Sequence, residues 1–585
     1  MKNKATAFGY HVKQQKLLLK NLVLPYKKNL FLGFIFLLFT NLNNAILPRL
    51  INKCVNFITK EKEIFINFID IKFNILNINN CLLIIALLAT IGVFIRTLSR
   101  VLIFDVGRNV EKDCMSILYK HLLIQDDEFY KKYKIGDLMN HLTSDVANIR
   151  MMTGFSLLSI LNILLLCCIS VPLLFLINYK LALVAFTPFI FIIIIAKTLS
   201  AKIFKSTKAH QEQLSNLASH LQENLLLFQL VKIFHRQSYE EERFKQTNDD
   251  VFASAFLVGK NRIIMNPLMR LCLGISVGFV LIYAIFLIQN NTISLGDFVE
   301  FNTRILQLAW PFMSVGFVIS SYSRGLASLE RINKLLNQQP KVTDGTESIN
   351  KITSISISNL HLNKDKKPLN LHITSPHKLA IIGPNGSFKS RLLNILCARI
   401  KIDNKKILFN EHDINNLKLD SLMQQITFVS ENPFLFNTSI RQNLSLGDVI
   451  PSEEELINAL KIVRLLDEVN NFPYKVDSII GERGISLSGG QKQRLAIARA
   501  IISKKPILIM DDALSATDTI SESHIMKELQ KLPHIKIMIL TIHRLSCIKS
   551  MDSIVVLDNG EMVGYGTHDY LLQNCSLYKQ LWGAV

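Results

Sequence analysis

Residues 383–390 read GPNGSFKS, and they follow KLAIIG (378–383), a short apolar run of strand length. A predicted helix begins where this glycine-rich turn ends. A phosphate-binding loop requires this context, because the backbone N–H groups of the turn and of the helix N-terminus point at the anion. Lys389 would reach the β- and γ-phosphates of a nucleotide, and Ser390 would ligate Mg²⁺. A plain strand–turn–helix is the alternative, since Phe388 stands where the motif has glycine.

A second predicted strand strengthens the nucleotide hypothesis. The run PILIMDD (506–512) is apolar and ends in two carboxylates. Asp511 would hold Mg²⁺ through water, and Asp512 lies where a general base would act on the attacking water. A lone apolar strand that ends in aspartate is common, but one that follows a phosphate loop in an α/β segment is much rarer. The loop residues that we expect to bind the nucleotide are Gly383, Pro384, Asn385, Gly386, Ser387, Phe388, Lys389, Ser390 and Arg391.

The third element is the pentapeptide LSGGQ (487–491), which precedes the basic helix QKQRLAIARA and then the Asp511 strand. Gly489 and Gly490 allow the backbone to approach a phosphate closely, and Ser488 can donate a hydrogen bond to it. An ordinary glycine loop does not explain three such elements in this order. On these residues the chain resembles the ATP-binding cassette (ABC) transporter superfamily, over essentially its whole length. The resemblance implies ATP and Mg²⁺ as cofactors.

The apolar residues of this 585-residue chain are unevenly distributed. Hydrophobic residues make up 49% of the chain and the mean hydropathy is +0.28, which is unusual for a soluble protein of this length. The long apolar runs lie in the first 330 residues, and a spanning helix needs about 20 mostly apolar residues. Six stretches qualify as spans: about 29–51, 81–104, 153–177, 181–200, 265–289 and 297–322.

The basic residues flank these apolar runs, in the positive-inside pattern of a membrane protein. With six spans, we expect the N-terminus, the long charged loops at about 105–152 and 201–264 and the C-terminal domain all to lie on the cytoplasmic side. The resemblance to ABC transporters implies a bacterial inner membrane. The formal charge of +20 therefore indicates a lipid bilayer as the partner. We expect no nucleic acid, whose binders cluster cations on one face beside aromatic side chains.

After residue 350 the pattern becomes α/β. Short strand-like runs alternate with helical segments such as 453–466 and 491–503, which argues a mostly parallel sheet. We therefore predict an all-α membrane domain with six transmembrane helices at 1–336, a polar linker at 337–350 and an α/β P-loop nucleotide-binding domain at 351–585.

The nine cysteines are an odd number, with no CxxC pair and no histidine cluster nearby. Cys167 and Cys168 lie inside an apolar run. The pattern predicts buried, reduced thiols rather than disulfides or a metal site.

The resemblance implies further roles. His543 looks like the switch histidine that contacts the γ-phosphate, and Glu431, in the loop FVSENPFLF (428–436), would act beside Mg²⁺ and the attacking water. SATD (515–518) resembles the loop that crosses to a partner domain. In this family the signature loop serves the ATP bound by a second subunit. The residues that would act in trans are Ser488, Gly489, Gly490 and Gln491.

Six helices ahead of one cassette match the layout of an exporter half-transporter. Residues 128–146 and 223–244 resemble the first and second intracellular loops of exporters. The partner that this layout implies is a second ABC half-transporter, either a different chain, which we prefer, or a second copy.

Four residues depart from the family pattern at one nucleotide site. Phe388 replaces a glycine, Glu431 replaces the usual glutamine, and Asp512 replaces the usual catalytic glutamate. Lys364 lies near the place where an aromatic side chain normally stacks on adenine. Aspartate is one methylene shorter than glutamate, and a displacement of ~1 Å can cost on the order of 10²-fold in rate. We therefore expect the chain's own site to be weak or non-hydrolytic.

The preferred function is ATP-driven export of hydrophobic compounds or lipids by a heterodimeric, multidrug-resistance-like ABC exporter. One alternative is a homodimeric lipid flippase that works slowly with Asp512 as the base. Another is a degenerate membrane subunit that binds nucleotide and regulates a partner without transporting anything. The substrate itself leaves no signature in the sequence.

Two charged residues of the sixth span lie four apart and share a helix face. Glu300 and Arg304, with Gln307 and Trp310 nearby, could line a substrate pathway, since charges inside a membrane are costly. They could equally form an ion pair near the outer interface. The sequence favours neither alternative.

The topology predicts which loops can be reached from outside the cell. An Asn291→Cys probe, between the fifth and sixth spans, should react with an impermeant thiol reagent in intact cells. A Lys131→Cys probe, in the first long loop, should react only after the membrane is opened. The reverse labelling pattern would refute the predicted orientation.

Overall fold

The structure is a computed structural model that describes residues 19–60, 64–68, 71–75, 78–445, 450–481, 487–542 and 545–583. Over these residues the chain divides into two compact units. The helical unit runs to Leu123 and continues over Ile135–Gln338. The α/β unit holds Ile124–Lys134 and the residues from Gln339 onward.

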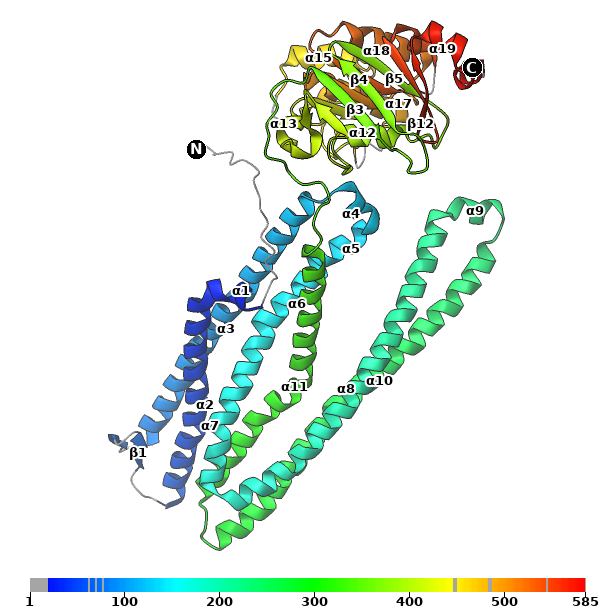
Figure 1. Cartoon of the computed structure of the whole chain (residues 1–585). Coiled ribbons are helices and arrows are strands. Elements are labelled where there is room, and N and C mark those ends of the chain that lie inside the picture. Colours follow the sequence, from blue (N-terminus) through cyan, green and yellow to red (C-terminus); the bar gives the residue numbers. More distant parts are fainter. Residues whose placement is uncertain are drawn as a thin grey trace. The chain divides into compact units, whose positions relative to one another are not determined.

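Two sheets form the α/β unit (Figure 1). The strands of the larger sheet are, in spatial order, β12 (Glu561–Gly566), β11 (Ser553–Asp558), β5 (His377–Ile382), β10 (Ile537–Thr541), β9 (Ile507–Asp511) and β8 (Ile426–Val429). All neighbours in it are parallel except β12, which is antiparallel to β11. The smaller, antiparallel sheet has the order β4 (Leu369–Thr374), β3 (Ser354–Leu360), β6 (Ile407–Phe409) and β7 (His412–Asp413).

Apolar clusters cover both faces of the large sheet. Successive residues of β5 point to opposite faces, so that Leu379 and Ile381 pack in one cluster, and Ala380 and Ile382 in the other. A parallel sheet buried on both faces explains why its strands are continuous apolar runs. The helices of this unit are α4 (Asp127–Lys132), α12 (Lys389–Leu396), α13 (Leu419–Met423), α14 (Ile440–Leu444), α15 (Glu453–Ile462), α16 (Leu466–Asn470), α17 (Gly489–Ile502), α18 (Thr519–Lys531), α19 (His568–Asn574) and α20 (Ser576–Gly583).

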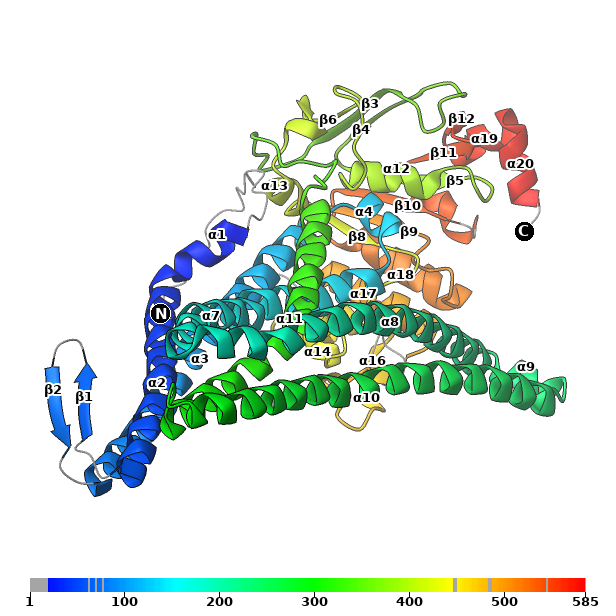
Figure 2. The ribbon, with the colours of Figure 1, turned by 90° about the horizontal axis from the view of Figure 1, so that it is seen from below.

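The helical unit is built mainly from very long helices. Its helices are α1 (Leu19–Val23), α2 (Lys27–Lys60), α3 (Ile78–Leu123), α5 (Ile135–Asn140), α6 (Val146–Met151), α7 (Leu157–Ile177), α8 (Tyr179–Leu226), α9 (Phe228–Ile233), α10 (Gln237–Gln289) and α11 (Leu295–Leu336). Two π-helical segments, His141–Asp145 and Met152–Ser156, join α5, α6 and α7 into one continuous rod. In the chain, the short antiparallel hairpin of β1 (Ile64–Phe68) and β2 (Ile71–Ile75) comes after α2 and before α3 (Figure 2).

The helices carry all six predicted spans. Within the described residues, five helical stretches are long and apolar enough to cross a membrane: Asn21–Thr59, Asn79–Leu123, Ile135–Ile177, Gln237–Gln289 and Leu295–Leu336. The remaining predicted span, 181–200, lies inside α8, a helix of 48 residues. The predicted all-α membrane domain, followed by an α/β domain, is confirmed.

Helices α8 and α10 form a long antiparallel pair that α9 closes at one end (Figures 1 and 2). Asn178 sets the entry to this pair, because its side-chain oxygen accepts a hydrogen bond from the backbone N–H of Leu181 at 3.0 Å and caps α8. Towards α9 the pair diverges from the other helices of the unit (Figure 1). The residues around α9 therefore lie far from the rest of the helical unit.

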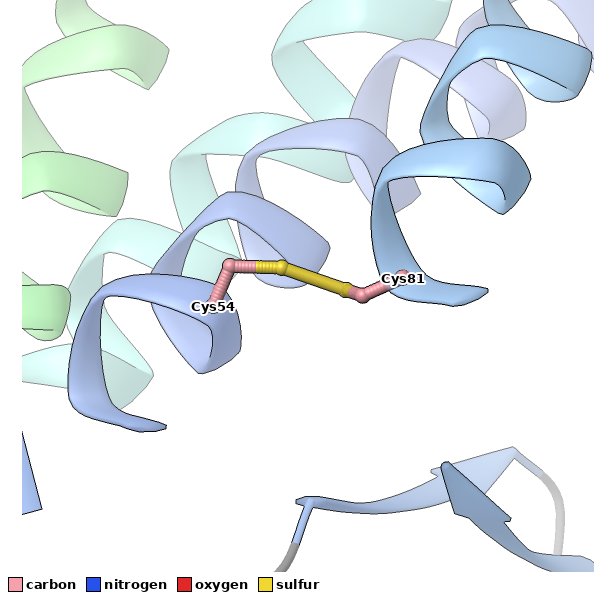
Figure 3. Close-up of a disulfide and its surroundings, with 2 residues drawn as sticks. All are labelled: Cys54 and Cys81. Carbon is pink, nitrogen blue, oxygen red and sulfur yellow. A yellow bond between two sulfur atoms is a disulfide. The ribbon is translucent and has the colours of Figure 1, made fainter. Parts of the chain in front are cut away.

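A disulfide links the end of α2 to the start of α3, between Cys54 and Cys81 (Figure 3). The prediction that the cysteines are reduced thiols is therefore wrong for this pair. The two residues are 27 positions apart and become neighbours only when the helices pack side by side. The predicted topology places this end of the helices outside the cytoplasm, where disulfides persist. Among the other cysteines described, Cys114, Cys167, Cys168, Cys272, Cys397 and Cys575 are free.

A buried polar seam joins α2 to α11. Arg304 donates to Glu300 Oε1 from Nε at 2.9 Å and from Nη2 at 2.6 Å, and Nη2 also donates to the carbonyl of Ala45 at 2.8 Å. Asn52 donates to Glu300 Oε2 at 2.7 Å and to Asp297 Oδ1 at 3.0 Å. Arg304 is 0% and Glu300 4% exposed. Glu300 and Arg304 thus form an ion pair within α11, and their hydrogen bonds with Ala45 and Asn52 tie α11 to α2.

The disulfide can be tested by peptide mapping. When the denatured protein is alkylated without reduction, Cys54 and Cys81 should appear as one cross-linked peptide pair, and Cys114 should be fully alkylated as an internal control. In a Cys54→Ser variant, Cys81 should become alkylated as well. Complete alkylation of both residues in the unreduced wild-type protein would contradict the structure.

The seam should matter for stability. Glu300→Leu leaves the buried guanidinium of Arg304 without its carboxylate, and breaking one partner of a buried pair costs about 3–5 kcal/mol of unfolding free energy. Glu300→Leu combined with Arg304→Met should recover most of that loss, because neither charge remains buried. Denaturant unfolding in mixed micelles measures both.

The matched control for the seam is Glu330→Gln. Glu330 and Lys334 have the same i, i+4 spacing on the same helix, but both side chains are mostly exposed. Exposed pairs add little to stability, so this variant should unfold like the wild type. If Glu300→Leu and Glu330→Gln lost equal amounts of unfolding free energy, burial would not explain the cost of breaking the Glu300–Arg304 pair.

Candidate nucleotide site

Three neighbouring strands of the large sheet bring the predicted site residues together. The loop 383–390 follows β5, Thr541 ends β10, and Asp511 ends β9. In the register of the sheet, Thr541 lies opposite Ile381 on one side and Asp511 on the other. The carboxyl ends of parallel strands meet at one edge, where ligands of open α/β sheets bind. The sheet therefore places the phosphate loop beside the Asp511 strand, as the sequence predicts.

Asp511 is the centre of the site. Its Oδ1 accepts hydrogen bonds from Ser390 Oγ at 3.0 Å and from Thr541 Oγ1 at 2.9 Å, and the residue is only 9% exposed. Mg²⁺ in nucleotide sites takes oxygen ligands from one or two protein groups and from the phosphates. The Ser390 hydroxyl and the Asp511 carboxylate fit this ion. Sequence reasoning missed Thr541, whose only signal is its place at the end of the strand KIMILT.

Lys389 folds back onto the phosphate loop. Its Nζ donates to the carbonyls of Gly383 at 2.7 Å and Pro384 at 3.0 Å. Burial lowers the pKa of this lysine, while the nearby carboxylates of Asp511 and Asp512 act in the opposite direction. A bound phosphate would offer the ammonium group stronger acceptors than these two carbonyls. Such an exchange suits a residue that holds β- and γ-phosphates.

The rest of the loop is a turn that leads into α12. Gly386 has φ +82° and Phe388, the N-cap of α12, has φ +69°, so that both lie in the left-handed region. Asn385, Gly386 and Arg391 are exposed, and Ser387 is buried. The loop can therefore offer backbone N–H groups to an anion at its exposed face.

The candidate base, Asp512, directly follows β9. It has φ +45°, and its backbone N–H donates to Thr541 Oγ1 at 2.8 Å. Thr541 thus bonds both members of the acidic pair and fixes the turn between them. Lys364 is exposed in the loop after β3. His543 lies outside the described residues.

Gln493 connects two loops of the site, and sequence reasoning missed it. Its Nε2 donates to the carbonyl of Glu431 at 3.0 Å and to Ser515 Oγ at 3.0 Å. Its Oε1 accepts from the backbone N–H of Ala516 at 2.9 Å. The side chain is buried, whereas that of Glu431 is exposed. No pattern in the sequence of α17 indicates that the polar side chain of Gln493 is buried.

The signature residues form the start of α17. Ser488 is the N-cap, and its Oγ accepts from the backbone N–H of Gln491 at 3.3 Å, while Gln491 Oε1 accepts from the N–H of Ser488 at 2.7 Å. This capping box presents an exposed Ser488 and Gly489 at a helix N-terminus, which favours anions. A Cβ on Gly490 would lie 2.6 Å from the carbonyl oxygen of Ala516, so glycine is required there by packing within the chain.

The SATD segment has a structural role of its own, because Asp518 caps α18 by accepting a hydrogen bond from the N–H of Ser521 at 2.8 Å.

The loop 428–436 ends in two exposed aromatic rings, Phe434 and Phe436, whose centroids are 5.1 Å apart. Arg499 donates to the carbonyl of Phe434 at 3.1 Å, and burial lowers its pKa to about 10.

Two families of known proteins match the chain. The ABC transporter transmembrane region matches residues 30–312, and the ABC transporter domain matches residues 366–515. The chain is 30% identical over 569 residues to the ATP-dependent lipid A-core flippase of Desulfotalea psychrophila, covering 96% of this chain and 97% of that protein. It is 29% identical over 544 residues to the multidrug resistance-like ATP-binding protein MdlA of Buchnera aphidicola, covering 92% of each.

The fold is similar to the structure of a bacterial Atm1-family ABC exporter with ATP bound. The TM-score is 0.77 at 24% identity, over 97% of this chain and 99% of that chain. The resemblance inferred from the three motifs is confirmed, and the chain belongs to the ABC transporter family, with a multi-pass membrane domain joined to an ATP-binding ATPase domain.

Proposed function

We propose that this chain is one half of a heterodimeric exporter that moves hydrophobic compounds or lipids outward across a bacterial inner membrane. Each half would bind Mg²⁺–ATP, and closure of the two ATP-binding domains around nucleotide would drive the membrane helices. In this proposal the chain's own site binds ATP but hydrolyses it poorly. The two relatives described above, one named a lipid A-core flippase and one named multidrug resistance-like, support an amphipathic or hydrophobic substrate.

One observation carries the asymmetry. Two of the groups that would hold phosphate and Mg²⁺ lie together, since Ser390 donates a hydrogen bond to Asp511 at 3.0 Å. The group that must activate water is one methylene shorter than the glutamate usual in this family. A base displaced by ~1 Å loses on the order of 10²-fold in rate. Binding and hydrolysis therefore separate at this site.

The signature end of α17 supports a shared site. Ser488 and Gly489 are exposed, and the helix N-terminus offers N–H groups and a positive dipole end to an anion. This chain would thus complete the ATP site of its partner, where an intact base performs the hydrolysis. His543, from this chain, would belong to the weak site.

The end of the α8–α10 pair also calls for a partner. Apolar side chains around α9 are widely exposed: Leu225, Leu226, Phe228, Ile233 and Phe234 are between 51% and 74% exposed. Contiguous exposed apolar surface of this kind marks an interaction site. The predicted topology places α9 in the cytoplasm, and we infer that the ATP-binding domain of the second half-transporter covers it.

A homodimeric lipid flippase is the second candidate. The lipid A-core flippase of Desulfotalea psychrophila is 30% identical to this chain over nearly the full length of both. In that case Asp512 would act as the base in two equivalent sites. Co-expression with a half-transporter encoded beside this chain separates the candidates: the heterodimer requires co-purification and substrate-stimulated ATPase from the pair, and the flippase requires ATPase from this chain alone.

Two substitutions in this chain should affect the ATPase of the pair differently. Asp512→Asn should lower turnover by less than about twofold, although a well-placed base contributes roughly 10²- to 10⁴-fold, because most turnover belongs to the partner's site. Gly489→Asp should lower it by on the order of 100-fold or more, since a carboxylate at the signature loop faces the partner's γ-phosphate and like charges at an interface cost several kcal/mol.

The structure selects Gly489 over Gly490 for this test. A Cβ on Gly489 meets only the Cβ of Ala516 at 3.6 Å, an ordinary contact, whereas one on Gly490 collides with the Ala516 carbonyl. Aspartate is also favourable in the first turn of a helix, so Gly489→Asp should fold. Gly489→Ala is the neutral control and should stay near wild-type turnover. Equal losses from Asp512→Asn and Gly489→Asp would indicate two equivalent sites and remove the asymmetric proposal.

A further inference from the structure

Phe388 has a conformation that its residue type disfavours. With φ +69° and ψ +22° it lies in the left-handed region, which a bulky residue adopts only at an energetic cost. Glycine would adopt it freely. Strained residues of this kind persist where the surrounding structure holds them, and they cluster at ligand-binding sites. The position lies inside the phosphate loop, one residue before Lys389.

The ring of Phe388 lies beside the loop that follows β3. A Cβ built on Gly560, in the turn between β11 and β12, would lie 3.4 Å from Phe388 Cδ2 and 2.9 Å from Asn363 Cβ. The ring edge and Asn363 therefore adjoin the same point of the turn. The guanidinium of Arg391 lies 5.9 Å from the ring centroid. The ring is only partly buried against the apolar cluster under the small sheet.

A nucleotide whose phosphates occupy the loop 383–390 extends its sugar and base away from that loop. The segment that follows β3, residues 361–366, reads HLNKDK and contains no phenylalanine, tyrosine or tryptophan. Phe388 brings a half-exposed aromatic ring to the edge of this segment, and a cation lies within reach of the ring. An aromatic ring beside a guanidinium is a surface on which bases stack.

We propose that Phe388 stacks on the base of the nucleotide bound by this chain, and so supplies from the phosphate loop the aromatic contact that the loop after β3 lacks. The inference rests on the proposed function, since it assumes that the chain's own site holds ATP. It explains why a strained phenylalanine replaces glycine in a site whose phosphate and Mg²⁺ ligands are intact. On this proposal, the replacement of the loop glycine by Phe388 strengthens ATP binding at this site.

The test compares ATP with inorganic tripolyphosphate, which has the phosphates but no base. Equilibrium binding of each, with Mg²⁺, is measured on the full-length chain purified in detergent without a partner. Phe388→Leu should weaken ATP binding by about 5- to 150-fold, the range for loss of one base stack. It should leave tripolyphosphate binding unchanged. Phe388→Tyr should bind ATP like the wild type.

A second-site variant checks that stacking is the cause. Lys364→Tyr, added to Phe388→Leu, places an aromatic ring in the loop after β3 and should restore most of the ATP affinity. Phe388→Gly, which relieves the strain, should still lose ATP affinity. Tighter ATP binding by Phe388→Gly, or an equal loss for ATP and tripolyphosphate in Phe388→Leu, would overturn the inference.

The proposed function fails by a different result. If the wild-type chain binds neither ATP nor tripolyphosphate, or if Lys389→Ala leaves both affinities unchanged, the phosphate loop is not a nucleotide site. If wild-type binding is normal and Lys389→Ala abolishes it, but Phe388→Leu has no effect on ATP, only the role of Phe388 is refuted.

Discussion

The buried carboxylate of Asp511 is the interaction on which the arrangement of the nucleotide site depends. A buried carboxylate must be hydrogen-bonded, because an unpaired one is costly. Ser390 and Thr541 both donate to its Oδ1, and they come from the start of α12 and the end of β10. One oxygen therefore fixes the phosphate loop against two strands. The turn at Asp512 follows from the same contact, since Thr541 also accepts its backbone N–H.

In the helical unit, too, buried polar side chains are paired, here by contacts between long helices. Polar side chains within apolar helices need partners, because no water is available in a bilayer to hydrate them. On α11, the charges of Glu300 and Arg304 are paired with each other. Glu300 also bonds Asn52 of α2, and Arg304 bonds the carbonyl of Ala45 of α2. The Cys54–Cys81 disulfide ties the same helix, α2, to α3. These residues hold α2, α3 and α11 together.

The sequence predicts well those features that produce a long run of similar residues or a fixed order of motifs. The spans follow from runs of about 20 apolar residues, and the phosphate loop follows from its place between a strand and a helix. Contacts between distant side chains have no such pattern. Nothing in the spacing pairs Cys54 with Cys81, and no periodicity marks Gln493 as buried. The difference between Gly489 and Gly490 depends on the Ala516 carbonyl, which only the folded chain brings near.

The departures of this site from its family concern separate steps of one reaction. In the proposed function, Lys389, Ser390 and Asp511 would bind the charged phosphates and Mg²⁺ and need only lie near them, so the site would still bind nucleotide. As the proposed base, Asp512 would have to place one oxygen against one water, so a missing methylene would affect the chemical step and little else. If Phe388 stacks on the base, that contact favours retention of ATP still further. A half-site that retains nucleotide without consuming it would keep the ATP-binding domains together on that side while the partner's site turns over. In a transporter with two inequivalent halves, loss of hydrolysis on one side thus need not cost the pair its function, because the signature loop of the same chain still serves the other side.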